Sequence, residues 1–148
     1  MKALIQRVTR ASLSISQEVH AEIDQGLLVL LGIGPRDSIE EAKKLLDKIF
    51  KLRIFADEAG KTSLSVQDVK GSVLIASQFT LYADCKKGNR PSFTKACAPD
   101  KAKALYEDVL NLCTDAPVRV VSGVFGADMQ ISLVNDGPFT IMLDTDEL

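Results

Sequence analysis

The sequence predicts a single α/β domain in which two helices accompany mixed, largely antiparallel sheets. The chain has 148 residues, of which 46% are apolar, and this suits one domain with one core. Several short segments alternate apolar and polar residues as half-buried strands do, whereas only two segments carry apolar residues at helical spacing. No change of composition and no repeat divides the chain, so we expect residues 1–148 to form one domain.

The first part of the chain, residues 2–34, is expected to form consecutive strands. Leu4 and Val8, and then Leu13 and Ile15, alternate with polar residues, as half-buried strands do. The run from Leu27 to Leu31 is apolar throughout, which is typical of a strand buried on both faces.

Two amphipathic helices are predicted. The first covers residues 38–51, because Ser38 and Glu41 form a capping box and apolar residues follow at helical spacing. The second begins at Pro99, since proline suits the first turn of a helix. Its apolar stripe comprises Ala102, Leu105, Tyr106, Val109, Leu110 and Cys113.

The other segments are predicted to be short strands, a turn and a loop. Residues 57–60 have the composition of a turn, and Gly88 and Pro91 break the segment 82–98, which we expect to be a loop. Strands are expected at 53–56, 73–81, 118–124, 129–135 and 138–144.

The most informative segment is Asn135–Thr140, in which Gly137 and Pro138 separate two strand-like stretches. Proline removes a ladder donor, glycine permits backbone angles that side chains forbid, and an X-Pro bond adopts the cis form at modest cost. The segment can therefore present backbone carbonyls, instead of side chains, to a ligand.

A second motif, Ser77–Leu81, closes an apolar run. Thr80 is a candidate nucleophile or an orienter of water at an ester carbonyl, although the residues alone favour a β-branched residue that fills a strand. Ser77 and Gln78 are suited to bind a substrate or to satisfy neighbouring backbone groups. Phe79 is suited to stack on adenine or to fill the core, and its backbone N–H to stabilise an oxyanion.

The sequence lacks the residues that histidine-dependent and metal-dependent catalytic sites require. The single histidine, His20, is expected to be an exposed strand residue, and no cluster has zinc-ligand spacing, so we expect neither a metal nor a cofactor. Cys85, Cys97 and Cys113 are unpatterned, which predicts reduced thiols and a cytoplasmic location. No run reaches the length of a membrane span, and the first residues lack the pattern of a signal peptide.

Residues Gly32–Asp37 resemble part of a dinucleotide fingerprint. The carboxylate of Asp37 stands in place of the third glycine and would repel a pyrophosphate, and Pro35 removes a donor. A helix cap at Asp37 or Ser38 is therefore the preferred interpretation, and a nucleotide-binding domain remains an alternative function.

The net charge of −2 argues against nonspecific binding of nucleic acid. A local basic patch, or equally a solvated charged loop, is formed by Lys86, Lys87, Arg90 and Lys95 beside the second motif. A nonenzymatic nucleic-acid-binding protein is a further alternative function.

The two motifs resemble those of the D-aminoacyl-tRNA deacylase family, Ser-Gln-x-x-Leu and Asn-x-Gly-Pro-x-Thr. The resemblance extends over nearly the whole chain, through Ala3–Ser12, Gly26–Gly32, Arg53–Phe55, Arg90–Phe93 and Ala127–Gln130. It implies a three-layer α/β/β domain and a cytoplasmic homodimer without cofactor. The implied reaction is hydrolysis of the ester that joins a D-amino acid to the 3′ end of tRNA, and mischarged glycyl-tRNA is a further expected substrate.

The resemblance also implies roles for single residues. The bond between Gly137 and Pro138 is expected to be cis, to enter the pocket of the neighbouring subunit, and to exclude L-amino acids with its carbonyls, while Arg7 braces it. The 2′-hydroxyl of the terminal adenosine is expected to help drive hydrolysis, with Ser77, Gln78, Phe79 and Thr80 in support. Substrate-binding positions extend to Thr140 and to Phe139, which stands where the family usually has a smaller β-branched residue, so the range of accepted amino acids is open.

Overall fold

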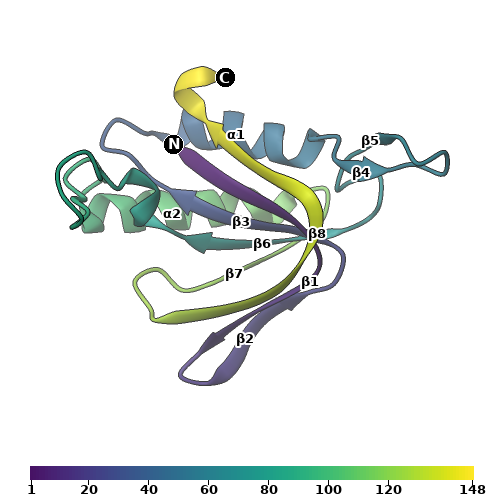
Figure 1. Ribbon diagram of the computed structural model, residues 1–148, viewed down its shortest axis with the longest axis horizontal. Coiled ribbons are helices and arrows are strands. Elements are labelled where there is room, and N and C mark those ends of the chain that lie inside the picture. Colours follow the sequence, from purple (N-terminus) through teal and green to yellow (C-terminus); the bar gives the residue numbers. More distant parts are fainter.

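The computed structural model describes all of residues 1–148 and contains a six-stranded sheet, a two-stranded sheet and two α-helices (Figure 1). The elements are β1 (Lys2–Ile15), β2 (Glu18–Ile23), β3 (Gly26–Gly32), α1 (Ile39–Lys51), β4 (Phe55–Ala56), β5 (Thr62–Leu64), β6 (Ser72–Ser77), η1 (Phe79–Tyr82), α2 (Pro99–Leu112), η2 (Cys113–Asp115), β7 (Arg119–Ser122), β8 (Met129–Asp144) and η3 (Thr145–Glu147), where η marks a 3₁₀ helix.

Strand β1 organises the large sheet. Its first half pairs with β3, its second half pairs with β2, and β8 runs antiparallel to it over nearly its whole length. Strands β3, β6 and β7 pair in parallel. The predicted mixed, largely antiparallel architecture with two helices is therefore confirmed.

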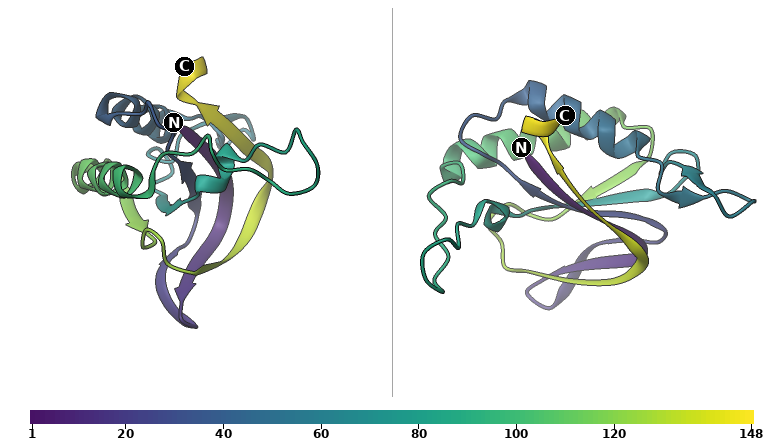
Figure 2. Two further views of the ribbon diagram at one scale, coloured as in Figure 1. Left: turned by 90° about the vertical axis from the view of Figure 1, so that its left-hand side faces the viewer. Right: turned by 45° about the horizontal axis from the view of Figure 1, so that its top comes forward.

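Two hydrophobic cores divide the domain into layers. Leu27, Val29 and Leu31 of β3 face the core beneath the helices, whereas Leu28 faces a second core with Leu13 of β1. The strand is thus buried on both faces, as its continuous apolar run predicts. Figure 2 shows both helices on one side of the strands, with the curved β8 on the opposite side. The layers are the helices, the β3–β6 region, and the curled part of the sheet built from β1, β2 and β8.

The first helix begins as its sequence predicts. The Ser38 side chain accepts a hydrogen bond from the backbone N–H of Glu40, while the Glu41 carboxylate accepts one from the backbone N–H of Ser38 at 2.8 Å. Of the two predicted caps, Ser38 is therefore the N-cap. The second helix begins at Pro99, which is also confirmed.

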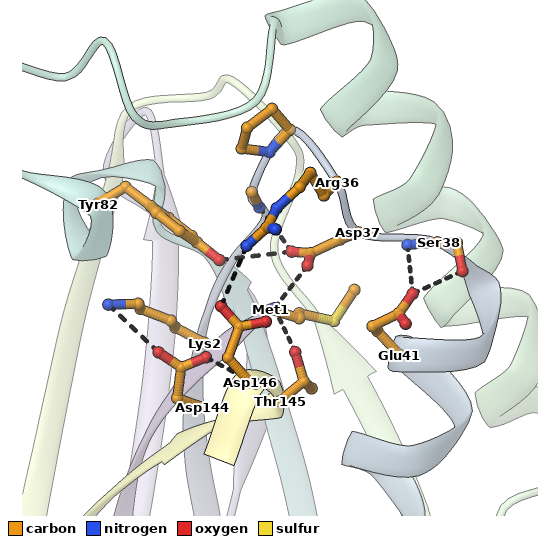
Figure 3. A network of polar contacts seen from close by, with 12 residues as sticks. Met1, Lys2, Arg36, Asp37, Ser38, Glu41, Tyr82, Asp144, Thr145 and Asp146 are labelled. Atoms are coloured by element: carbon orange, nitrogen blue, oxygen red, sulfur yellow. Dashed lines mark hydrogen bonds and ion pairs between the residues drawn. The ribbon is translucent and has the colours of Figure 1, made fainter. Parts of the chain in front are cut away.

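Asp37 has a different role, shown in Figure 3. Its carboxylate is buried, accepts a hydrogen bond from the backbone N–H of Gly34 at 2.6 Å, and lies 2.6 Å from the Met1 amino group. The Tyr82 hydroxyl at the end of η1 lies 3.4 Å from the same carboxylate. Burial raises the pKa of Tyr82, and the nearby charge of Asp37 raises it further, so the phenol stays neutral. This network connects the start of α1 to η1.

Two predicted strand boundaries are wrong. The strand expected at 73–81 ends at Ser77, because the last ladder bond runs from the Gln78 N–H to the Leu31 carbonyl and the neighbouring β3 ends one residue later. The chain then turns into η1, with the Leu81 N–H bonded to the Gln78 carbonyl. The separate strands expected at 129–135 and 138–144 are one strand, β8, in which the Gly-Pro segment is a bulge. The hairpin partner β5 was not predicted, because three residues carry too little pattern.

Candidate functional site

The Ser77–Leu81 motif borders a cavity of about 650 Å³ at the end of β6. Ser77, Gln78 and Phe79 line it, and the opposite wall comes from the loop before α2 and from the segment 125–131. Most of the lining is apolar: Leu31, Ile33, Ala76, Phe93, Ala96, Cys97, Pro99, Ala102, Phe125, Ala127, Met129 and Ile131. A cavity of this size with a few polar groups suits a small organic moiety.

The polar part of the motif has few partners within the protein. The Gln78 side-chain amide donates to the Thr80 hydroxyl at 2.5 Å, and the Thr80 carbonyl accepts from the Ala83 N–H at 3.0 Å. The N–H groups of Phe79 and Thr80 open the 3₁₀ helix and so have no acceptor within it. These N–H groups suit an oxyanion, whereas the Thr80 hydroxyl has no basic side chain to activate it.

Two aromatic rings form the outer edge of the cavity. Phe79 is 56% exposed, although such a ring normally packs in a core, and Phe93 is 39% exposed. Their ring centroids lie 5.1 Å apart in an edge-to-face arrangement. Exposed aromatic faces beside a cavity suit the stacking of a nucleobase.

The Gly32–Asp37 segment does not form a nucleotide site. A side chain at Gly34 would lie 2.7 Å from the Tyr82 hydroxyl, and one at Gly32 would lie 3.1 Å from the Gln78 carbonyl oxygen. These glycines are required because η1 packs against them, and the Asp37 carboxylate already occupies the Gly34 N–H. The glycines that resemble a dinucleotide fingerprint therefore serve the packing of η1 and do not bind a nucleotide.

The Asn135–Thr140 motif forms a wide bulge opposite Arg7. Between the pairs Gln6–Thr140 and Val8–Asn135, Arg7 alone faces the four residues 136–139. The guanidinium is buried and donates to the carbonyls of Asp136 at 3.0 Å, Ile54 at 2.5 Å and Gly137 at 3.5 Å. It also pairs with the Asp136 carboxylate at 3.0 Å. Arg7 thus braces the bulge, and the Gly137–Pro138 bond is cis, as the resemblance implies.

Phe139 completes the packing of this bulge. Its ring centroid lies 4.3 Å from the Arg7 guanidinium carbon, which is a cation–π contact, and the ring also packs against the core beneath the helices. The Thr140 hydroxyl contacts the Gln6 side chain. Gly137 and Pro138 themselves are exposed.

The structure brings the predicted site residues together in two groups instead of one. Ser77, Gln78 and Phe79 line the cavity and Thr80 follows them in η1, while Arg7 and residues 137–140 lie at the bulge between β1 and β8. The first group follows Leu31 at the end of β3, whereas Arg7 pairs with Leu27 near its start. Four residues of strand, or about 13 Å, separate these two positions.

Sequence reasoning missed the segment 125–131 as a wall of the cavity. Its signal was present in the Ala127–Gln130 match and in Gly126, whose φ of 76° marks a turn. His20 is exposed on β2, as predicted. No cluster of three or more metal-ligating side chains occurs. Neither helix has the length and apolar character that crossing a membrane requires.

Comparisons with known proteins identify the same family that the two motifs resemble. The family described as D-Tyr-tRNA(Tyr) deacylase matches residues 4–144. A protein named D-aminoacyl-tRNA deacylase from Thermosipho africanus is 52% identical over 145 residues, which are 98% of this chain and 97% of the relative. A solved structure named c-Myc DNA Unwinding Element Binding Protein is 43% identical with a TM-score of 0.90, over 97% of this chain and 98% of that one. A structure described as a probable eukaryotic D-amino acid tRNA deacylase, 20% identical, shares the fold with a TM-score of 0.82 over 96% of this chain and 97% of that one.

Proposed function

The chain belongs to the D-Tyr-tRNA(Tyr) deacylase family and hydrolyses D-aminoacyl-tRNA, and we propose that two copies of it together build each active site. The reaction cleaves the ester between the amino acid and the tRNA, so that free tRNA and a D-amino acid are released. The observation that carries the shared site is the separation of the two motifs along β3. A second copy, related by two-fold symmetry, supplies its Gly137–Pro138 segment to the cavity of the first.

The surface of β8 supports this assembly. Leu133, Val134 and Met142 are large apolar residues on β8 that stay exposed in the single chain. Apolar side chains gathered on one strand favour contact with another protein surface. The same strand carries Gly137 and Pro138, so a dimer formed through β8 presents them to the partner.

Within the shared site, the enzyme rejects L-amino acids by exclusion. Arg7 fixes the Asp136 and Gly137 carbonyls, which form a rigid wall without a side chain. A D-amino acid directs its side chain away from this wall, whereas an L-amino acid directs it into the wall. Glycine has no side chain to exclude, so mischarged glycyl-tRNA is accepted as well.

Catalysis relies on backbone groups and on the substrate. Water attacks the ester carbonyl, the bond to the ribose oxygen breaks, and that oxygen takes a proton. The Phe79 N–H stabilises the oxyanion, and the adenosine 2′-hydroxyl helps to drive the attack. Thr80 and Gln78 hold η1 in position, which is supported by their mutual hydrogen bond. Ser77 contacts the substrate at the edge of the cavity. The reaction is proposed to take place in the cytoplasm.

The function is tested by incubating the purified protein with D- and L-tyrosyl-tRNA at matched concentrations. We expect rapid hydrolysis of the D-substrate only, and light scattering should give twice the 16.1 kDa mass of one chain. Equal hydrolysis of both substrates would contradict exclusion, and a fully active monomer would contradict the shared site.

Mixed dimers give a sharper test of the shared site. Phe79→Pro removes the N–H that is proposed to stabilise the oxyanion, and Gly137→Val places a side chain in the partner's cavity. The valine is tolerated within its own chain, where the nearest atom to a Cβ at Gly137 is the Asn135 amide nitrogen at an ordinary 3.6 Å. Each variant alone should be inactive. Mixing them should restore about a quarter of the activity, since half of the dimers are mixed and one of their two sites holds both intact motifs. No restoration after verified subunit exchange would place both motifs in one chain's site.

Binding of DNA is a second candidate function, favoured by the name of the solved relative with 43% identity. It is distinguished by measuring the affinity for a DNA duplex and for tRNA at the same salt concentration. A tighter complex with the duplex, together with no hydrolysis of the D-substrate, would support it.

A further inference from the structure

A basic arm stands beside the cavity between η1 and α2. We define it as residues 83–95, which form a loop closed by paired backbone hydrogen bonds between Asp84 and Ser92 at 2.7 and 2.9 Å. Figures 1 and 2 show that this loop projects from the body at the end of the molecule opposite the β4–β5 hairpin. Gly88, with a φ of 67°, permits the turn at its tip.

The charges of the basic arm differ from those of the whole chain. The arm carries four cationic side chains and one carboxylate, so its net charge is +3 in a protein whose net charge is −2. Lys95 pairs with the carboxylate of Asp84 at 2.8 Å. Lys86, Lys87 and Arg90 are exposed and have no carboxylate within ion-pair distance. Three cations without carboxylate partners give this tip a local positive charge.

The basic arm is joined to the cavity through its aromatic residue. Phe93 belongs to the arm and packs edge-on against Phe79 of the motif, and both rings line the cavity. Phe93 and Arg90 are three positions apart, which spans at most about 10 Å of extended chain. Arg90 therefore lies within a few nucleotides of any nucleoside that occupies the cavity, and Lys86 and Lys87 belong to the same loop.

We propose that the basic arm binds the phosphate backbone of the tRNA nucleotides that precede the 3′-terminal adenosine. This inference rests on the proposed function, because it assumes that the aminoacylated end enters the cavity beside Phe79. An acidic protein must overcome repulsion to bind a polyanion, and cations beside the cavity attract the strand where its end must enter. Lysine and arginine contact phosphates without reading bases, so the arm serves tRNAs of different sequence.

The test compares two substrates and two triple variants. The arm variant is K86Q/K87Q/R90Q, and the matched control is K43Q/K48Q/K61Q, which removes the same charge from exposed positions on α1 and the β4–β5 hairpin. The substrates are D-tyrosyl-tRNA and D-tyrosyl-adenosine, which lacks the phosphates. For the arm variant we expect kcat/KM on the tRNA substrate to fall at least tenfold and to stay unchanged on the nucleoside substrate.

Salt dependence gives a second readout. Removing three phosphate contacts should lower the slope of log kcat/KM against log salt by about 2, at about 0.7 for each contact with a single strand. Equal losses on both substrates, or equal losses in the control variant, would overturn the proposal. So would a wild-type rate on tRNA in the arm variant. Failure of the wild-type protein to hydrolyse either substrate would instead refute the proposed function, and anisotropy with uncharged tRNA would still test the arm.

Discussion

Replacing Arg7 with lysine keeps the positive charge beside the Gly137 carbonyl but removes most of the hydrogen bonds that hold the bulge in place. The planar guanidinium contacts three carbonyls and one carboxylate. The compact ammonium group of a lysine would contact about one of these four acceptors. We expect Arg7→Lys to hydrolyse D-tyrosyl-tRNA more slowly and to discriminate less against L-tyrosyl-tRNA.

The size of the effect follows from the distances. A charge-assisted hydrogen bond contributes about 1.5–3 kcal/mol, and the Gly137 contact at 3.5 Å belongs at the lower end. Loss of this contact alone corresponds to a factor of about 10 in selectivity. If the Asp136 carbonyl contact at 3.0 Å is lost as well, the total approaches about 3 kcal/mol, or a factor of about 150.

The assay is single-turnover hydrolysis of D- and L-tyrosyl-tRNA, from which the ratio of the two rates is calculated. Arg10→Lys is the matched control, since Arg10 lies on the same strand and is exposed. An unchanged ratio in Arg7→Lys would refute the argument that braced carbonyls provide selectivity, even if the D-substrate rate fell.

Three further predictions concern other parts of the chain. Thr80→Ala should retain measurable hydrolysis in single-turnover assays, because the Thr80 hydroxyl contacts only the Gln78 amide; a loss on the order of 10⁴-fold would instead identify a nucleophile. Asp37→Ala should lower the free energy of unfolding in urea by about 3–5 kcal/mol, because it leaves buried partners uncompensated; a change below about 1 kcal/mol would contradict this role. Burial raises the pKa of Tyr106 from 10 to about 12, so its stabilising effect is complete below pH 10 and is lost as the pH rises toward 12. The free energy of unfolding should therefore fall by up to about 1.4 kcal/mol per pH unit in that range, and less steeply in Tyr106→Phe; parallel curves would exclude Tyr106 as the cause.

Local pattern predicted most elements of this fold because their causes lie within a few residues. The capping box at Ser38 and the proline at Pro99 fix the starts of both helices. The run Leu27–Leu31 indicates a strand buried on both faces, and two cores do enclose it. None of these conclusions needs information from a distant part of the chain.

The errors have distant causes. Residues after Ser77 continue an apolar pattern, but the strand ends because its neighbour β3 ends, and Phe79 then enters a 3₁₀ helix. The Gly-Pro segment does not end β8, because Arg7 on β1, about 130 positions earlier, supplies donors to the bulge. The motif matches identified both segments of the proposed site, while their separation along β3 is a property of the sheet.

Packing within the chain explains why several positions must be glycine, but it does not explain Gly137. A side chain at Gly26 would lie 1.8 Å from the Ser72 carbonyl oxygen, and one at Gly34 would lie 2.7 Å from the Tyr82 hydroxyl, so packing explains both. At Gly137 the nearest atom, the Asn135 amide nitrogen, lies at an ordinary 3.6 Å, and the backbone is outside the left-handed region. Nothing within the chain therefore demands a glycine at this point of the bulge. The proposed dimer accounts for the glycine, because a wall of carbonyls placed inside a partner's cavity requires a position without a side chain.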